Sequence, residues 1–102
     1  MSARVLVAGR VVGAAVRRQR EDGTPFTVLT LAESGNSKRI WKILALDPHL
    51  MRRLEALNDG EPLAAAGEIF AKAEVDGSVS LRVVADAVLD ARVPPSKKRR
   101  PR

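Results

Sequence analysis

Residues 38–57 read KRIWKILALDPHLMRRLEAL, and the hydrophobic period changes in the middle of this stretch. Residues 38–46 are rich in aliphatic side chains and are typical of a strand. Asp47 is a good N-cap and Pro48 suits the first helical position. Leu50, Leu54 and Leu57 then follow at helical spacing. We therefore expect a strand that passes into a short amphipathic helix over residues 48–57.

Strands are predicted on both sides of this stretch. The valine-rich start contains Gly9 and Gly13, which suit a bend or bulge, and Asp76-Gly77 is a strong hairpin signal. The further expected strands cover residues 4–18, 25–33, 62–75 and 78–90. This order predicts an all-β fold, a five-stranded OB-fold barrel with one short α-helix between strands 3 and 4. Another small β-barrel remains the alternative.

Composition narrows the classes of function. The chain has 102 residues, no cysteine and one histidine, His49, so we expect one domain, no metal site and no cofactor. His49 beside Asp47-Pro48 suits a cap neighbour better than a catalyst, and we expect no enzyme and no small-molecule substrate. No apolar run is long enough to span a membrane. With five arginines in the first 20 residues no signal peptide is visible, and we expect a cytoplasmic protein.

Charge is distributed unevenly along the chain. Residues 1–42 carry eight basic and three acidic side chains, whereas residues 43–91 carry four basic and nine acidic ones. Residues 92–102 carry six basic side chains and no acidic one. We expect a folded domain over residues 1–91 and a disordered basic tail over 92–102. A basic first half and tail favour a polyanion partner, although a solvated surface with a solubilising tail fits the same charges.

An ordered set of motifs resembles one family. The motifs are VLVAGRV at 5–11, GTPFTVLTLA at 23–32, IWKILAL at 40–46, DGEPL at 59–63, AGEI at 66–69 and VVADAV at 83–88. Together they resemble the bacterial single-stranded DNA-binding proteins over about residues 3–90. Residues 14–18 and 23–26 also resemble primosomal replication protein N, a short dimeric branch of that fold. The resemblance implies single-stranded DNA binding in replication, repair or recombination by a homodimer or homotetramer.

Two departures from the family stand out. Its members end in a flexible segment with an acidic, aromatic tip, and this chain ends in basic residues. They also stack bases on several aromatic side chains, whereas this chain has one tryptophan, two phenylalanines and no tyrosine. Glu74 stands near a position where the family often has a tryptophan. We therefore expect an affinity that is lower than in the family, or one that depends more on charge.

Binding single strands without reading sequence requires aromatic faces and a basic path for the phosphates. Trp41 lies between basic residues and is the first stacking candidate, with a core tryptophan as the alternative. Phe70 and Phe26 are further candidates; the alternatives are a subunit interface for Phe70 and a plug of the barrel end for Phe26. The basic candidates for phosphate contacts are Arg10, Arg17, Arg18, Lys38, Arg39, Lys42 and Lys72, with Lys97, Lys98, Arg99 and Arg100 in the tail.

Two other classes of function remain open from the sequence. In one, the barrel is an assembly scaffold with Phe70, Ile43 and Ala64–Ala66 as an interaction surface. In the other, the partner is RNA, which OB folds also bind. Valine- and alanine-rich strands leave apolar surface that a small monomer would rarely expose, and this supports a homo-oligomer.

Overall fold

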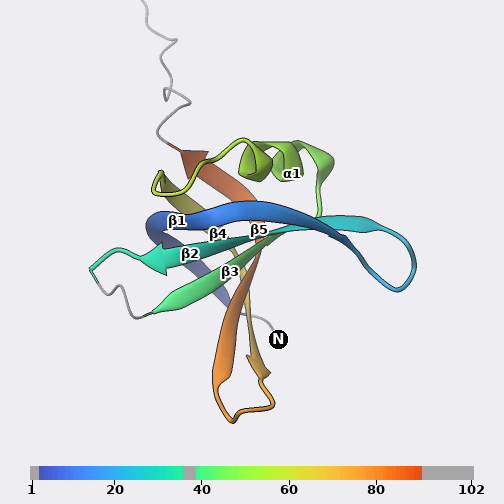
Figure 1. Ribbon diagram of the computed structural model, residues 1–102, viewed down its shortest axis with the longest axis vertical. Coiled ribbons are helices and arrows are strands. Elements are labelled where there is room, and N and C mark those ends of the chain that lie inside the picture. The colour runs from blue at the N-terminus through green and yellow to red at the C-terminus, as the bar shows by residue number, and fades with distance from the viewer. Residues whose placement is uncertain (1–2, 36–38, 91–102) are drawn as a thin grey trace, which may run out of the picture.

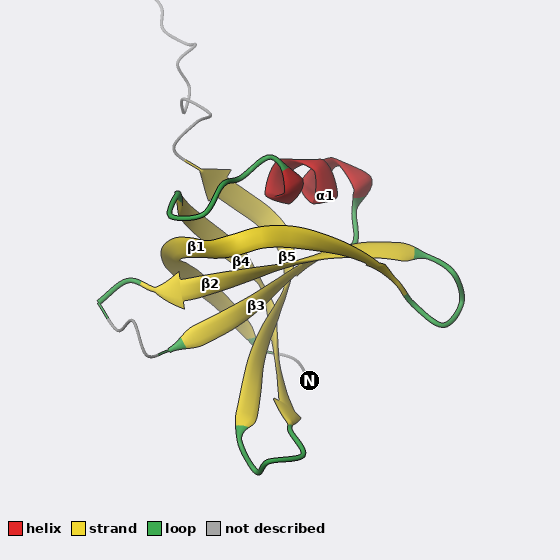
Figure 2. Ribbon diagram, viewed as in Figure 1, coloured by secondary structure: helices red, strands yellow, loops and turns green. Residues whose placement is uncertain are grey.

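The computed structural model describes residues 3–35 and 39–90 (Figure 1). The elements follow the order β1 (Arg4–Gln19), β2 (Pro25–Glu33), β3 (Ile40–Ala45), α1 (Pro48–Glu55), β4 (Pro62–Ala73) and β5 (Val79–Asp90). Figure 2 shows that strands make up most of the molecule and that the helix lies over one end of them. The predicted all-β architecture with one helix between the third and fourth strands is confirmed.

The strands close into a barrel in the order β1-β2-β3-β5-β4. Neighbours are antiparallel, except that β3 and β5 pair in parallel. The long strand β1 serves both ends of the sheet, since it pairs with β4 up to Arg10 and with β2 from Gly9 onward. The β1–β2 and β4–β5 hairpins project beyond the barrel as two arms (Figure 1).

The predicted bulge in β1 lies at Gly13. The register against β2 shifts between Val12 and Val16, and Gly13 has a φ of 75°, a conformation that glycine adopts without a side-chain clash. The Gly13 amide donates to Asp59 Oδ1 at 2.7 Å. Gly9 has a different role, because a Cβ there would lie 1.9 Å from the carbonyl oxygen of Ala32. Gly9 therefore permits the close strand contact where β1 changes partner.

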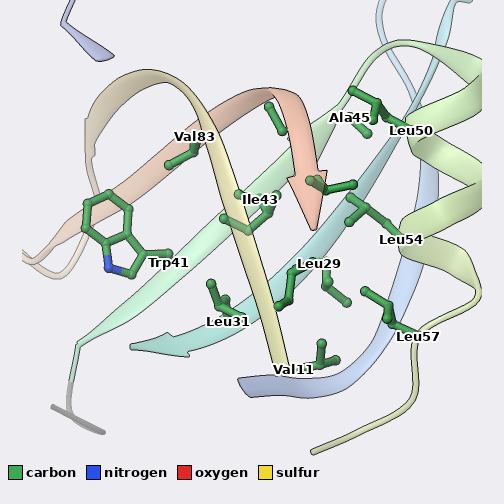
Figure 3. Close-up of a cluster of buried hydrophobic side chains, with 14 of the residues drawn as sticks. Val11, Leu29, Leu31, Trp41, Ile43, Ala45, Leu50, Leu54, Leu57 and Val83 are labelled. Carbon is green, nitrogen blue, oxygen red and sulfur yellow. The ribbon is translucent and has the colours of Figure 1, made fainter. Parts of the chain in front are cut away.

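The core fills the barrel and continues under the helix. Leu29, Leu31 and Ile43 are fully buried on the inward faces of β2 and β3. Asp47 caps α1 as predicted, with its Oδ2 accepting from the Leu50 amide at 3.1 Å. Figure 3 shows Leu50 and Leu54 of α1, with Leu57 beyond it, packed against one end of this cluster. The helix thus closes one end of the barrel and leaves the outer faces of the strands exposed.

Candidate nucleic-acid interface

Four side chains line up across the outer face of the sheet. Thr30 of β2 pairs with Lys42 of β3, Lys42 pairs with Arg82 of β5, and Arg82 pairs with Phe70 of β4. We call Thr30, Lys42, Arg82 and Phe70 the Phe70 row. Residues directly opposite on an antiparallel pair have Cβ atoms about 4.5–5.5 Å apart, so an aromatic ring and a guanidinium lie side by side at its end.

The cations of the Phe70 row keep hydrogen-bonding capacity. Lys42 Nζ donates to Thr30 Oγ1 at 3.0 Å, and an ammonium has two further donors. Arg82 Nε is buried and has no hydrogen-bond partner among the described residues. Buried polar atoms are rarely left unpaired. A guanidinium fork fits the oxygens of carboxylates and phosphates.

The surroundings of Phe70 are suited to a polyanion. Phe70 is 47% exposed, and Lys72 follows two residues later on the same face of β4. Glu68 precedes it on this face and lies opposite Arg4 of β1 in the register. The Arg4 pKa is raised first by the hydrogen bond to Asp86, with a smaller contribution from the charge of Glu68. An exposed aromatic ring among Lys42, Arg82 and Lys72 provides the two features that single-strand binding requires.

Trp41, the first stacking candidate from the sequence, lies in the core. Its side chain is 5% exposed, and it packs beyond Leu31 and Ile43 at the end of the cluster away from α1 (Figure 3). Its Nε1 donates to Glu33 Oε1 at 2.8 Å. A base needs a free ring face, so this geometry corresponds to the alternative of a core tryptophan. The signal was present in the sequence, since Trp41 shares its face of the strand with the aliphatic Ile43.

Arg17 and Arg18 are neighbours with different surroundings. Arg17 pairs with Thr27 on the face toward α1, where its Nε and Nη2 donate to Glu55 at 2.8 and 2.9 Å. The hydrogen bond from Arg17, followed by the one from the Thr27 hydroxyl at 2.6 Å, holds the pKa of the Glu55 carboxyl below its ordinary value. Arg17 is therefore occupied in joining β1 to the helix.

Arg18 points away from the helix, because successive residues of a strand alternate faces. It is exposed and lies opposite Phe26 of β2. Phe26 is half-buried and lines a hollow at the β1–β2 hairpin. It lies on the outward face of its strand rather than among the core residues. The sequence candidates Arg18 and Phe26 thus form a second pair of a cation and an aromatic ring.

The remaining basic candidates are scattered. Arg10 is exposed and its Nη1 donates to the Gly60 carbonyl at 3.0 Å. Arg39 lies near Glu33, with Nη1 3.8 Å from Oε1, and both line a groove together with Trp41. Lys38 and the tail candidates Lys97, Lys98, Arg99 and Arg100 lie outside the described residues.

The structure corrects the interaction surface considered from the sequence. Ile43 and Ala65 are fully buried, so they pack inside the barrel and cannot contact a partner. Ala64 and Ala66 lie on the outward face of β4 and remain partly exposed. Sequence reasoning also missed Arg82. The sequence did contain a signal for it. In a hairpin that is symmetric about Asp76, Arg82 lies opposite Phe70.

Residues 3–35 and 39–90 contain no cluster of three or more histidine, aspartate or glutamate side chains that could hold a metal ion. Within these ranges no helix is long and apolar enough to cross a membrane. His49 is exposed at the start of α1, in the place expected for a cap neighbour.

Comparison with solved structures addresses the fold. The small single-stranded DNA-binding protein of Streptomyces coelicolor matches with a TM-score of 0.70 at 16% identity, over 88% of this chain and 93% of that one. The mitochondrial single-stranded DNA-binding protein of S. cerevisiae matches with a TM-score of 0.70 at 10% identity, over 89% and 97%. The single-stranded DNA-binding protein of Thermus aquaticus matches with a TM-score of 0.68 at 20% identity, over 92% of this chain and 42% of that one.

The chain has the fold of these proteins. The match covers most of the chain at identities of 20% or less, so the likeness concerns the path of the backbone and not particular binding residues. No protein-family model matches the chain, and no curated protein matches it in sequence. The binding residues must therefore be argued from this chain's own surface.

Proposed function

We propose that this protein binds single-stranded DNA through base stacking and phosphate contacts, and holds it during replication, repair or recombination. The strand lies across the outer face of the barrel, between the two hairpin arms. Phe70 stacks on a base, while Arg82, Lys42 and Lys72 contact the phosphates on either side. This is a binding function, with no chemical step assigned to any residue.

The observation that carries the proposal is the Phe70 row itself. An exposed ring lies opposite a guanidinium whose buried Nε has no partner among the described residues, with Lys42 on the next strand. OB folds bind oligonucleotides on the face of strands 2 and 3 and with the loops between strands 1–2 and 4–5. Lys42 lies on that face, and Phe70 leads into the second of those loops.

Oligonucleotide binding tests this assignment. We expect Phe70→Ala to weaken binding of a labelled dT oligonucleotide, because a stacked base contributes about 1–3 kcal/mol, which is about 5- to 150-fold in Kd. Phe70→Trp keeps a ring and should restore the affinity. Anisotropy titrations with the DNA strand, the same strand as RNA, and a duplex compare the possible partners. Equal binding by Phe70→Ala and the unchanged protein, or tighter binding to duplex, would contradict the proposal.

We also infer that the protein forms a homodimer through another part of its outer surface. Two leucines and four alanines from β1, β4 and β5 are joined by the strand register into one apolar patch. These are Leu6, Ala8, Ala64, Ala66, Ala87 and Leu89. Leu6 and Leu89 are 72% and 57% exposed. Two leucines beside a shallow floor of alanines are complementary to a second copy, in which a leucine fits between alanines.

Placing a charged side chain in the apolar patch tests the proposed dimer. Leu6→Asp should convert the dimer to a monomer, because it buries a carboxylate in an apolar interface, while an exposed position leaves the barrel fold intact. Light scattering at tens of micromolar measures the mass, and circular dichroism checks the fold. A monomeric mass for the unchanged protein, or a dimer that survives Leu6→Asp, would remove this inference.

A further inference from the structure

The β1–β2 hairpin and Phe26 line a shallow, open hollow that the Phe70 row does not reach. It is lined by Gln19, Arg20, Glu21, Asp22 and Phe26, and its volume of about 570 Å³ is open to solvent. Phe26 contributes an aromatic wall, and the hairpin contributes the polar ones. Arg18 lies opposite Phe26 in the strand register.

The hairpin that forms the polar walls is held by its own hydrogen bonds. The Arg20 amide donates to the Thr24 carbonyl at 2.8 Å, and the Gly23 amide donates to the Arg20 carbonyl at 2.8 Å. Asp22 Oδ1 accepts from the Thr24 hydroxyl at 2.7 Å and from its amide at 2.9 Å. These bonds, led by the hydroxyl, lower the pKa of Asp22, so its carboxylate is charged at neutral pH. The walls are therefore formed before a ligand binds.

The charged side chains of the hollow favour an uncharged base over a phosphate. Glu21 and Asp22 place two carboxylates beside one guanidinium, that of Arg20, and Arg20 Nε already donates to Thr24 Oγ1 at 2.7 Å. A phosphate is repelled by two carboxylates. A flat, uncharged base can stack on Phe26, and a carboxylate accepts a hydrogen bond from an exocyclic amino group. The Gln19 amide can both donate to and accept from a base edge.

We propose that this hollow is a base-binding subsite that favours bases with an exocyclic amino group. One base of the bound strand stacks on Phe26 and donates to the hairpin carboxylates, while Arg18 holds the phosphate outside. Cytosine has the amino group and thymine has only acceptors on that edge. The subsite rests on the proposed single-strand binding, to which it adds a preference for dC over dT.

The test is the ratio of affinities for dC and dT oligonucleotides of equal length at pH 7.5. A hydrogen bond to a charged carboxylate contributes about 1.5–3 kcal/mol, so we expect dC to bind about 10- to 150-fold more tightly. Glu21→Ala should bring the ratio close to one without weakening dT, because it removes an acceptor and a negative charge. Phe26→Ala should weaken both oligonucleotides and also abolish the preference. Phe26→Leu, which keeps apolar bulk, should do the same if the alanine variant is unstable.

Phe70→Ala is the matched control, since it should weaken dC and dT equally and leave their ratio unchanged. Equal affinity of the unchanged protein for dC and dT overturns the subsite alone, as does a dC preference that persists in Glu21→Ala and Phe26→Leu. Failure of the unchanged protein to bind either strand overturns the proposed function and the subsite together. The two failures are therefore distinguishable in one set of titrations.

Discussion

Trp41 connects the barrel core to the end of β2 through its hydrogen bond to Glu33. We expect Trp41→Phe to destabilise the fold by about 1–3 kcal/mol, because it leaves a cavity and removes a bond. Oligonucleotide affinity of the folded protein should stay within twofold. Thermal unfolding followed by circular dichroism measures the first effect and anisotropy the second. A variant with unchanged stability and much weaker DNA binding would return Trp41 to the stacking role.

Glu55 makes the stability of the fold depend on pH. Its folded pKa lies below the unfolded value of about 4.3, so its stabilising effect is complete above that pH and is lost as the pH falls through the folded pKa. Glu55→Gln should therefore be less stable than the unchanged protein at pH 7, and the difference should shrink below about pH 4. Urea unfolding from pH 7 to pH 3 measures it. A difference that is constant with pH would contradict the ion pair with Arg17.

The roles of single residues were only partly predictable from the sequence. Arg17 and Arg18 are adjacent arginines that the sequence does not distinguish. They lie on opposite faces of β1, so that Arg17 forms an ion pair with Glu55 while Arg18 lies opposite Phe26. Arg82 is the one basic residue of β5. Its importance comes from Lys42 and Phe70 on two other strands. Such neighbours depend on strand register over long distances, which local patterns do not contain.

At the scale of elements, the helix boundary can be tested directly. Asp47→Ala removes the acceptor for the Leu50 amide and should destabilise the protein by about 0.5–2 kcal/mol. Asp47→Asn retains an N-cap oxygen and should remain close to the unchanged protein. Urea unfolding compares the three. If alanine and asparagine are equally damaging, the charge of Asp47 matters and its capping bond does not.

The elements themselves were predictable because they depend on local signals. The change of period at Asp47-Pro48 gave the helix start, and Asp76-Gly77 gave the second hairpin, in which Gly77 has a φ of 90°. The strand β2 has the expected bounds, and the other strands differ from them by one or two residues at an end. The helix ends at Glu55, two residues before the expected end. The parallel pairing of β3 with β5 closes the barrel, and no local signal contains it; it followed only from the expected OB fold.

At the scale of the whole molecule, the basic tail is predicted to add affinity without selectivity. Residues 92–102 carry six basic side chains, and phosphate contacts are lost as salt rises. Deleting residues 93–102 should weaken dT binding at low salt and leave the ratio of dC to dT affinities unchanged. Anisotropy at 50 mM salt measures both. No change in affinity at low salt would indicate that the tail serves another partner.

The salt dependence of binding tests the central claim most directly. Each phosphate contact to a single strand contributes about 0.7 to the slope of log K against log salt. The account predicts that Arg82→Ala reduces the slope for a dT oligonucleotide by about that amount, and that Lys42→Ala does the same. Arg52→Ala, an exposed arginine on α1, should leave the slope unchanged. Equal slopes for Arg82→Ala, Lys42→Ala and the unchanged protein would contradict a strand bound along the Phe70 row.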